Sequence, residues 1–303
     1  MAAPDVARVP PRRRTAVISG ASSGIGRAIA LALADRGWRL GLVASGATRL
    51  EAVAAEIRAR SPGAAPTVHP ADLALQQEVR RVAASLRAEY PVLDALVNDA
   101  GAWFHHRAET AEGVERTWAL NVLAPTLLTE LLRPSLRAAA PSRVVLVSSA
   151  AHRGQHLHLD DLEGRAAYRG FTQYGRSKLA LILLTHVLDA RYREDGISVN
   201  ALHPGFIRSR FGQNNPGAVG RGMWLLTRLG GRSPAYGART PVWLVTAPEA
   251  AGFHGAYFVR AKPARSSAAS YDAAIAEGLW EDCVRRLHLE PPVPGTAGVP
   301  TAP

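Results

Sequence analysis

The chain has 303 residues, of which 47% are hydrophobic, and this composition is typical of a globular protein with a full core. Its longest strongly apolar stretch, Leu179–Leu188, contains Thr185 and His186 and is shorter than the roughly 20 apolar residues that cross a bilayer. The N-terminus has arginines but no apolar run after them, so it does not resemble a secretory signal. A single cysteine, Cys283, excludes an internal disulfide and a multi-cysteine metal site, and favours the cytoplasm.

The formal net charge is +11, and nearly all of the positive charge is arginine, because Lys178 and Lys262 are the only lysines. One interpretation is binding to a polyanion such as a nucleic acid. The other is a bias toward Ala, Arg, Gly and Pro along the whole chain. We favour the bias and expect no nucleic-acid partner, because the arginines form no block apart from Arg12–Arg14. A basic protein also suits an anionic dinucleotide.

Both ends of the chain are rich in Pro and Ala. Residues 1–13 predict a disordered basic tail, and residues 291–303 predict a disordered proline-rich tail. No long linker and no internal repeat separates them. We therefore expect one domain over residues 14–290.

Between the tails, apolar strand-like runs alternate with helical patterns. The predicted strands are Thr15–Ser19, Leu40–Ala44, Pro66–His69, Leu93–Val97, Arg143–Ser148 and Ser198–Leu202. The predicted helices are Ile25–Arg36, Arg49–Arg60, Gln76–Glu89, Ala111–Leu136 and Thr172–Arg193. This alternation indicates an α/β fold, a single doubly wound Rossmann domain with a mainly parallel sheet of about seven strands and helices on both faces. Such sheets bind ligands outside the carboxyl ends of their strands.

A glycine-rich loop follows the first strand and precedes a helix. It reads Ser-Gly-Ala-Ser-Ser-Gly-Ile-Gly over residues 19–26. Its glycines allow a tight turn and a close approach to a pyrophosphate, and the helix N-terminus offers free N–H groups. The predicted cofactor contacts in this loop are Gly20, Ser22, Ser23, Gly24, Ile25 and Gly26. The spacing is G-x-x-x-G-x-G, which differs from the G-x-G-x-x-G of two-domain dehydrogenases.

This spacing resembles the loop of the short-chain dehydrogenase/reductase family, with Ser19 in place of the usual Thr. Further motifs follow in the family's order over about residues 14–290: Asp72-Leu73, Asn98-Asp99-Ala100-Gly101, Asn121, Ser148-Ser149, Tyr174-x-x-x-Lys178 and Pro204-Gly205. The resemblance implies that the cofactor contacts Asp72, Leu73, Asn98, Ala100, Gly101, Tyr174, Lys178, Pro204 and Gly205. Asp99 departs from the family pattern, which has a second Asn there.

The predicted reaction transfers a hydride between a nicotinamide cofactor and a carbonyl or alcohol. The carbonyl oxygen gains charge and needs a proton donor. Tyr174 and Lys178 are four residues apart on a helix and share one face, so the cation should lower the pKa of the phenol. A surface pair is the alternative, and the rarity of lysine in this chain argues against it.

Two further residues complete the predicted catalytic set. Ser149 is predicted to hold the substrate oxygen, with Ser148 as the alternative. The family uses the Asn at position 121 to hold a water that links the lysine to solvent. A helix kink with a buried amide is another interpretation of Asn121, and both can be true.

The end of the second strand bears on the choice of cofactor. NAD enzymes of this fold usually place an acid there, and this chain has Ala44-Ser45-Gly46 instead. Ser45 and Arg49 are predicted to bind the ribose 2′-phosphate. NADP(H) is therefore preferred, and NAD(H) remains possible.

Ser149 and Tyr174 are 25 positions apart, and the insertion between them resembles the retinol dehydrogenase-like branch of the family. This resemblance implies a lipophilic aldehyde, ketone or alcohol as substrate. Membrane members of that branch have an N-terminal anchor, and we expect none here. We expect no metal site, because the histidines of the insertion, His152, His156 and His158, lack an acid–histidine signature. An apolar helix around Trp224, Leu225 and Leu226 is either a lid over the substrate or plain core packing.

The helix Thr172–Arg193 is apolar on most sides, with Leu181, Leu184 and Leu188 continuing around it. In relatives this helix often packs against its twofold mate, so a homodimer or homotetramer is expected. The sequence leaves two functions open. One is an active oxidoreductase, and the other is a non-catalytic dinucleotide-binding regulator on the same fold. The complete set of catalytic residues favours the enzyme.

Overall fold

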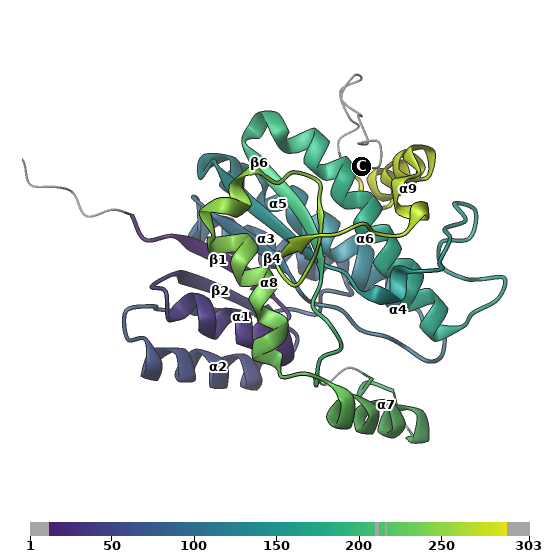
Figure 1. The fold of residues 1–303 in the computed structure, drawn as a ribbon, viewed down its shortest axis with the longest axis horizontal. Helices are drawn as coiled ribbons and strands as arrows, with labels where there is room; N and C mark the ends of the chain where they lie inside the picture. The colour runs from purple at the N-terminus through teal and green to yellow at the C-terminus, as the bar shows by residue number, and fades with distance from the viewer. Residues whose placement is uncertain (1–11, 210–211, 216, 290–303) are drawn as a thin grey trace, which may run out of the picture.

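The computed structural model describes residues 12–209, 212–215 and 217–289. These residues form one eight-stranded sheet with the order β3-β2-β1-β4-β5-β6-β7-β8 (Figure 1). The strands are β1 (Thr15–Ser19), β2 (Arg39–Ala44), β3 (Thr67–Pro70), β4 (Ala95–Asn98), β5 (Ser142–Val147), β6 (Ile197–His203), β7 (Tyr257–Val259) and β8 (Lys262–Pro263). All pairs are parallel except β7 with β8. The predicted doubly wound sheet is confirmed, with eight strands where about seven were expected.

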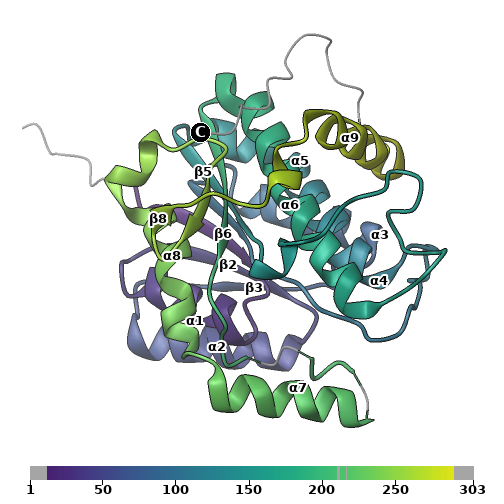
Figure 2. The same cartoon turned by 45° about the vertical axis from the view of Figure 1, so that its right-hand side comes forward.

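Helices cover both faces of the sheet (Figures 1 and 2). Alternate strand residues face opposite ways, so Val17, Leu96 and Val144 join one buried cluster while Ile18 and Val97 join the other. The first cluster includes residues of α3, α5, α6 and α9, and the second includes residues of α1, α2 and α8. The helices are α1 (Gly24–Ala34), α2 (Ala47–Arg60), α3 (Gln76–Glu89), α4 (Arg116–Trp118), α5 (Ala124–Ala138), α6 (Gly170–Tyr192), α7 (Gly217–Gly230), α8 (Pro234–Thr246) and α9 (Ala273–Leu287).

The predicted elements lie within a few residues of the observed ones, with one exception. The helix expected over Ala111–Leu136 begins only at Arg116, and Ala119–Leu123 forms a π-helical turn between α4 and α5. Pro125 explains the irregularity, because it has no N–H to donate to the carbonyl of Asn121 four residues earlier. The prediction of one continuous helix was therefore wrong at the position of Asn121.

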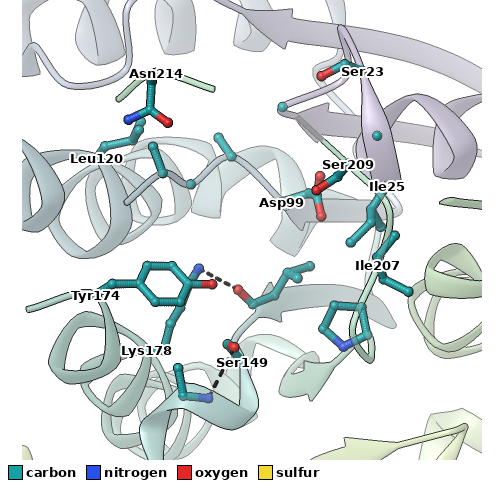
Figure 3. A pocket seen from close by; sticks show the side chains of 18 of the residues that line it. Ser23, Ile25, Asp99, Leu120, Ser149, Tyr174, Lys178, Ile207, Ser209 and Asn214 are labelled. Atoms are coloured by element: carbon teal, nitrogen blue, oxygen red, sulfur yellow. Dashed lines mark hydrogen bonds between the residues drawn. The ribbon is translucent and has the colours of Figure 1, made fainter. Parts of the chain in front are cut away.

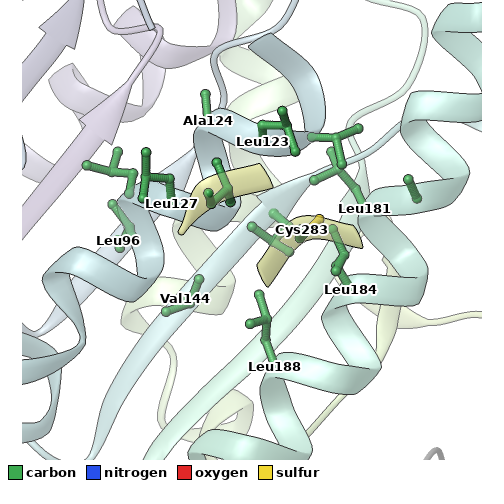
Figure 4. Packing of buried hydrophobic residues seen from close by; sticks show 14 of the residues in the cluster. Leu96, Leu123, Ala124, Leu127, Val144, Leu181, Leu184, Leu188 and Cys283 are labelled. Carbon is green, nitrogen blue, oxygen red and sulfur yellow. The ribbon is translucent and has the colours of Figure 1, made fainter. Parts of the chain in front are cut away.

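The long helix α6 is buried within the single chain. Leu181, Leu184 and Leu188 belong to the same cluster as Cys283 of α9, which packs over α6 (Figure 4). Burial also leaves Cys283 as a free thiol inside the fold. The apolar character of α6 thus has a partner in α9 and does not by itself require a second copy.

The arginine block near the N-terminus is engaged by the fold. Arg12 pairs with Asp94 at 2.7 Å, Arg13 donates to the carbonyl of Gly63, and Arg14 lies over the ring of Trp38. Arg12, Arg13 and Arg14 therefore have partners within the chain, and their clustering does not require a polyanion as ligand. Apart from residues 12 and 13, the predicted tails lie outside the described residues, so their disorder stays a prediction. In the described part of the chain, no helix is long and apolar enough to cross a membrane.

Candidate active site

A cavity of about 740 Å³ opens at the carboxyl edge of the parallel strands. Its wall contains most of the predicted site residues: Gly20, Ser22, Ser23, Gly24, Ile25, Ser45, Asp72, Leu73, Ala100, Gly101, Ser149, Tyr174, Lys178, Pro204 and Gly205. Four predicted residues, Gly26, Arg49, Asn98 and Asn121, are not part of the wall. Motifs that are up to 185 positions apart in the sequence, from Gly20 to Gly205, therefore meet at one site.

The glycine loop is shaped for a close approach of backbone. Gly20 has a φ of +74°, and a Cβ on it would lie 2.9 Å from the backbone nitrogen of Ala100. Gly26 lies beneath the loop, where a Cβ would collide with the carbonyl of Gly20. Gly26 therefore shapes the loop from behind. The free N–H groups at the start of α1 and the close-packed glycines fit a dinucleotide pyrophosphate.

Asn98 and Asn121 hold the wall from behind. The Asn98 amide donates to Thr129 Oγ1 at 3.1 Å and so ties the end of β4 to α5. The Asn121 amide donates to the carbonyl of Ala102 and to Ser177 Oγ, both at 2.9 Å, and its oxygen accepts the N–H of Ala102. The Asn121 side chain thus joins the loop after β4 to α6, and the interpretation as a helix kink with a buried amide is confirmed. The role of Asn121 in holding a water stays a prediction.

Tyr174, Ser149 and Lys178 come together from α6 and the end of β5 (Figure 3). The Tyr174 hydroxyl is hydrogen-bonded to Ser149. The Lys178 ammonium lies 5.7 Å from the centre of the Tyr174 ring and donates to the carbonyl of Val147 at 2.9 Å. This places a phenol, a hydroxyl and a cation in one small part of the cavity.

The charge states in this cluster differ from the expected ones. Burial raises the pKa of Tyr174 to about 12, although the hydrogen bond to Ser149 lowers it, and the charge of Asp99 adds to the rise. Burial also lowers the pKa of Lys178 to about 8, while Asp99 raises it. The pKa of Tyr174 is thus raised and not lowered as expected, because burial of the phenol is the largest effect on it. At neutral pH Tyr174 is a phenol and can donate a proton.

The two serines after β5 have separate partners. Ser148 is buried and donates to the carbonyl of Lys178 at 2.7 Å, which fixes α6 against the strand. The Ser149 hydroxyl instead faces Tyr174, and its oxygen accepts the N–H of Ala151 at 3.2 Å. Ser149 therefore has the geometry expected for holding a substrate oxygen. Ser148 has a structural role, because its hydroxyl is engaged by the backbone of α6.

The insertion after Ser149 is anchored to the site by His152. Its Nδ1 lies 2.6 Å from the Ser149 carbonyl, and its Nε2 accepts the N–H of Ser267 at 3.2 Å. His152 is fully buried and ties the segment after Ser149 to the loop that contains Ser267. Among the described residues no group of His, Cys, Asp and Glu could hold a metal ion.

Two titratable residues of the cavity wall were not predicted. Asp99 lies beside Ile25 on the cofactor-loop side (Figure 3) and accepts the N–H of Gly26. Burial raises its pKa to about 7, and Lys178 and the Gly26 N–H oppose that rise. His203 accepts the N–H of Ala150 at Nδ1, and burial lowers its pKa to about 4, which makes it neutral. The sequence did contain a signal for Asp99, because this residue departs from the family motif.

Ser45 lies in the cavity wall just after β2, and the Arg49 guanidinium folds back over Gly46, the residue that follows Ser45. A Cβ on Gly46 would lie 2.5 Å from a terminal nitrogen of Arg49. Arg49 is exposed and has no ion pair with a described residue. A hydroxyl and a guanidinium thus stand at the end of β2, where an acid is absent.

The other end of the cavity is largely apolar. Its wall contains Phe104, Leu120, Phe171, Phe206, Met223 and Leu226, together with the polar side chains of Arg116 and Asn214. Leu225 and Leu226 of α7 are 49% and 57% exposed, so core packing of this helix, one of the two interpretations, was wrong. The helix borders the cavity through Met223, Leu226 and Thr227, as a lid would.

A dinucleotide loop, a polar end with Tyr174 and Lys178, and an apolar end define a nicotinamide-dependent oxidoreductase acting on alcohols or carbonyls. The short chain dehydrogenase family model matches residues 14–218. Human retinol dehydrogenase 13 is 34% identical over 300 residues, covering 96% of this chain and 89% of its own. A Streptomyces sp. (strain C5) protein named as a daunorubicin C-13 ketoreductase, DnrU, is 39% identical, covering 88% and 90%.

A solved structure shares the fold as well. L-sorbose reductase of Gluconobacter frateurii, complexed with NADPH and L-sorbose, has a TM-score of 0.64 and 25% identity, covering 81% of this chain and 94% of its own. The chain belongs to the short-chain dehydrogenase/reductase family, and it resembles the retinol dehydrogenases within that family.

Proposed function

We propose that the protein is an NADP(H)-dependent carbonyl reductase or alcohol dehydrogenase for apolar aldehydes, ketones or the matching alcohols. The single observation that supports this most is the phenol of Tyr174, hydrogen-bonded to Ser149 at the boundary between the dinucleotide loop and the apolar end. The experiment that tests it is a panel of such substrates with NADPH and NADH, followed by the absorbance of the reduced nicotinamide. Turnover of an apolar carbonyl compound with NADPH is expected.

The residues would share the work of proton transfer. When bound, the reduced nicotinamide supplies the hydride. Ser149 holds the carbonyl oxygen, and Tyr174 donates its proton to that oxygen as negative charge develops. Lys178 holds the next proton and orients the nicotinamide ribose. The Asn121 carbonyl, which receives no bond from Pro125, holds a water that connects Lys178 to solvent.

The cofactor preference gives the first prediction. NADPH should bind more tightly than NADH, because Ser45 and Arg49 can meet a 2′-phosphate and no acid repels it. Ser45→Asp should weaken NADPH binding by about tenfold or more, since it sets a carboxylate beside the phosphate. Ser45→Asn, which has nearly the same shape without the charge, is the control. Fluorescence titration measures both, and a clear preference of the wild type for NADH would refute the assignment.

Asp99 gives a second prediction. Its carboxylate accepts the Gly26 N–H at the helix end that we assign to the pyrophosphate, so the ionised form should oppose an anionic cofactor. Because its pKa is about 7, NADPH affinity should fall as the pH rises from 6 to 8. Asp99→Asn should bind NADPH about threefold to tenfold more tightly at pH 8 and equally at pH 6. If the dissociation constants of the two proteins stay parallel over this range, Asp99 does not have this role.

The oligomeric state is a third prediction. Relatives often pair two copies through α6, and we propose a homodimer or homotetramer. Light scattering at micromolar concentration should give a mass of two or four chains. A monomer alone would contradict the proposal. The coverage of α6 by α9 would then explain why this apolar helix needs no second copy.

A further inference from the structure

The helix α7 exposes more large apolar side chains than any other described helix. Val219, Trp224, Leu225, Leu226 and Leu229 are 40%, 36%, 49%, 57% and 78% exposed. Within α7 only Gly220 and Thr227 are buried. The helix projects at the edge of the molecule in both views (Figures 1 and 2). Burying this surface in an apolar environment would be favourable.

The exposed apolar residues form a continuous strip. At 100° per residue, Val219, Leu225, Leu226 and Leu229 fall within an arc of about 120° around the helix axis. We call these four residues the outer strip. Leu226 also lines the cavity, whereas Leu225 and Leu229 do not. The outer strip therefore begins at the mouth of the cavity and continues away from it.

Arginines border the outer strip. Arg221 and Arg228 are seven residues apart on one flank, and Arg228 lies over the ring of Trp224 at 5.2 Å. The sequence has no acidic residue from 196 to 248, while it has six arginines there. Among the described residues, Arg208, Arg221, Arg228 and Arg232 form no ion pair. This positive charge is not neutralised locally.

We propose that α7 docks on a lipid bilayer that contains anionic lipids. The outer strip would enter the boundary between headgroups and acyl chains, and Arg221 and Arg228 would meet the lipid phosphates. Binding to the bilayer does not depend on the catalytic activity of the protein. Because Leu226 belongs both to the outer strip and to the cavity wall, an apolar substrate in the bilayer could pass directly into the cavity, and this last step rests on the proposed function.

Two other occupants fit this surface less well. A twofold contact between α7 helices of two copies would bring Arg221 and Arg228 near their own copies, with no acid in this stretch to pair with them. Closure of α7 over the cavity would cover Met223 and Leu226 and leave Leu225 and Leu229 in water. An anionic bilayer satisfies both the apolar and the charged part of the surface.

Flotation of the full chain with lipid vesicles tests the proposal. The protein should bind vesicles of phosphatidylcholine mixed with phosphatidylglycerol at least about tenfold more strongly than vesicles of phosphatidylcholine alone, and high salt should weaken the binding. Leu225→Ser with Leu229→Ser should lower this binding by about tenfold or more, and Arg221→Gln with Arg228→Gln should do the same. These positions do not line the cavity, so the affinity for NADPH should not change.

The matched control is Arg87→Gln with Arg137→Gln. It removes the same charge from exposed ends of α3 and α5, at the opposite edge of the sheet, and should bind vesicles like the wild type. Failure of the wild type to float with anionic vesicles would overturn the proposal, as would equal loss in the control. A shift from dimer to monomer in the α7 variants, with vesicle binding unchanged, would assign α7 to a second copy instead. Failure of the proposed function would appear as absent turnover, with vesicle binding intact.

Discussion

Tyr174→Phe should lower turnover by about 10²–10⁴ or more while leaving the fold and NADPH binding nearly intact. The substitution removes only the phenol oxygen, which is hydrogen-bonded to Ser149 in the cavity. Burial keeps the pKa of Tyr174 near 12, so below that pH the wild type always has a proton to donate. Without this proton, the hydride would move toward a carbonyl whose developing charge is not neutralised. Steady-state rates on the best substrate of the panel measure the loss.

Tyr90→Phe is the matched control for this prediction. Tyr90 is buried and its hydroxyl pairs with Thr67 Oγ1 at 2.8 Å, away from the cavity. The control should turn over at close to the wild-type rate. A folded Tyr174→Phe protein that also did so would refute the mechanism. The non-catalytic regulator predicts another pattern, namely no turnover by the wild type on any substrate and unchanged cofactor binding in Tyr174→Phe.

The sequence predicted the site well where strand ends and motifs coincide. Gly20, Asp72, Ala100 and Ser149 each follow a strand in the parallel part of the sheet, and strand topology alone brings such positions to one edge. The glycine spacing and the Tyr174–Lys178 interval are local patterns with a physical cause. No long-range contact had to be known to place these residues in a common site.

Other features depend on contacts that no local pattern encodes. The coverage of α6 by α9 joins Leu184 to Cys283 across about a hundred positions, so an apolar helix was interpreted as a sign of a second copy. The effect of burial on Tyr174 and Lys178 needs the surrounding atoms, and the sequence suggested only the attraction between cation and phenolate. The strands β7 and β8 are two or three residues long, too short for a periodic signal.

Lys178→Met should impair both turnover and cofactor binding. The change keeps the length of a buried side chain but removes the ammonium that donates to the Val147 carbonyl. Hydrogen bonds to a charged group are worth about 1.5–3 kcal/mol, so NADPH affinity should fall by about tenfold to a hundredfold if Lys178 also holds the nicotinamide ribose. Lys178→Arg should not restore turnover. The ammonium and the Asn121 Oδ1 both lie 3.2 Å from the place where a Cβ on Gly101 would stand, so the site is shaped for a compact cation, and a planar guanidinium does not reproduce its geometry.

The other lysine of the chain supplies the control. Lys262 is exposed on β8, and Lys262→Met should leave NADPH affinity and turnover unchanged. The pH profile separates proton delivery from mere packing at position 178. Burial lowers the pKa of Lys178 to about 8, so the wild-type rate of carbonyl reduction should fall as the pH rises through about 8, when the stored proton is lost. In Lys178→Met this decline should be absent from the residual rate. If the variant keeps the same decline, another group delivers the proton, and Lys178 only orients the cofactor.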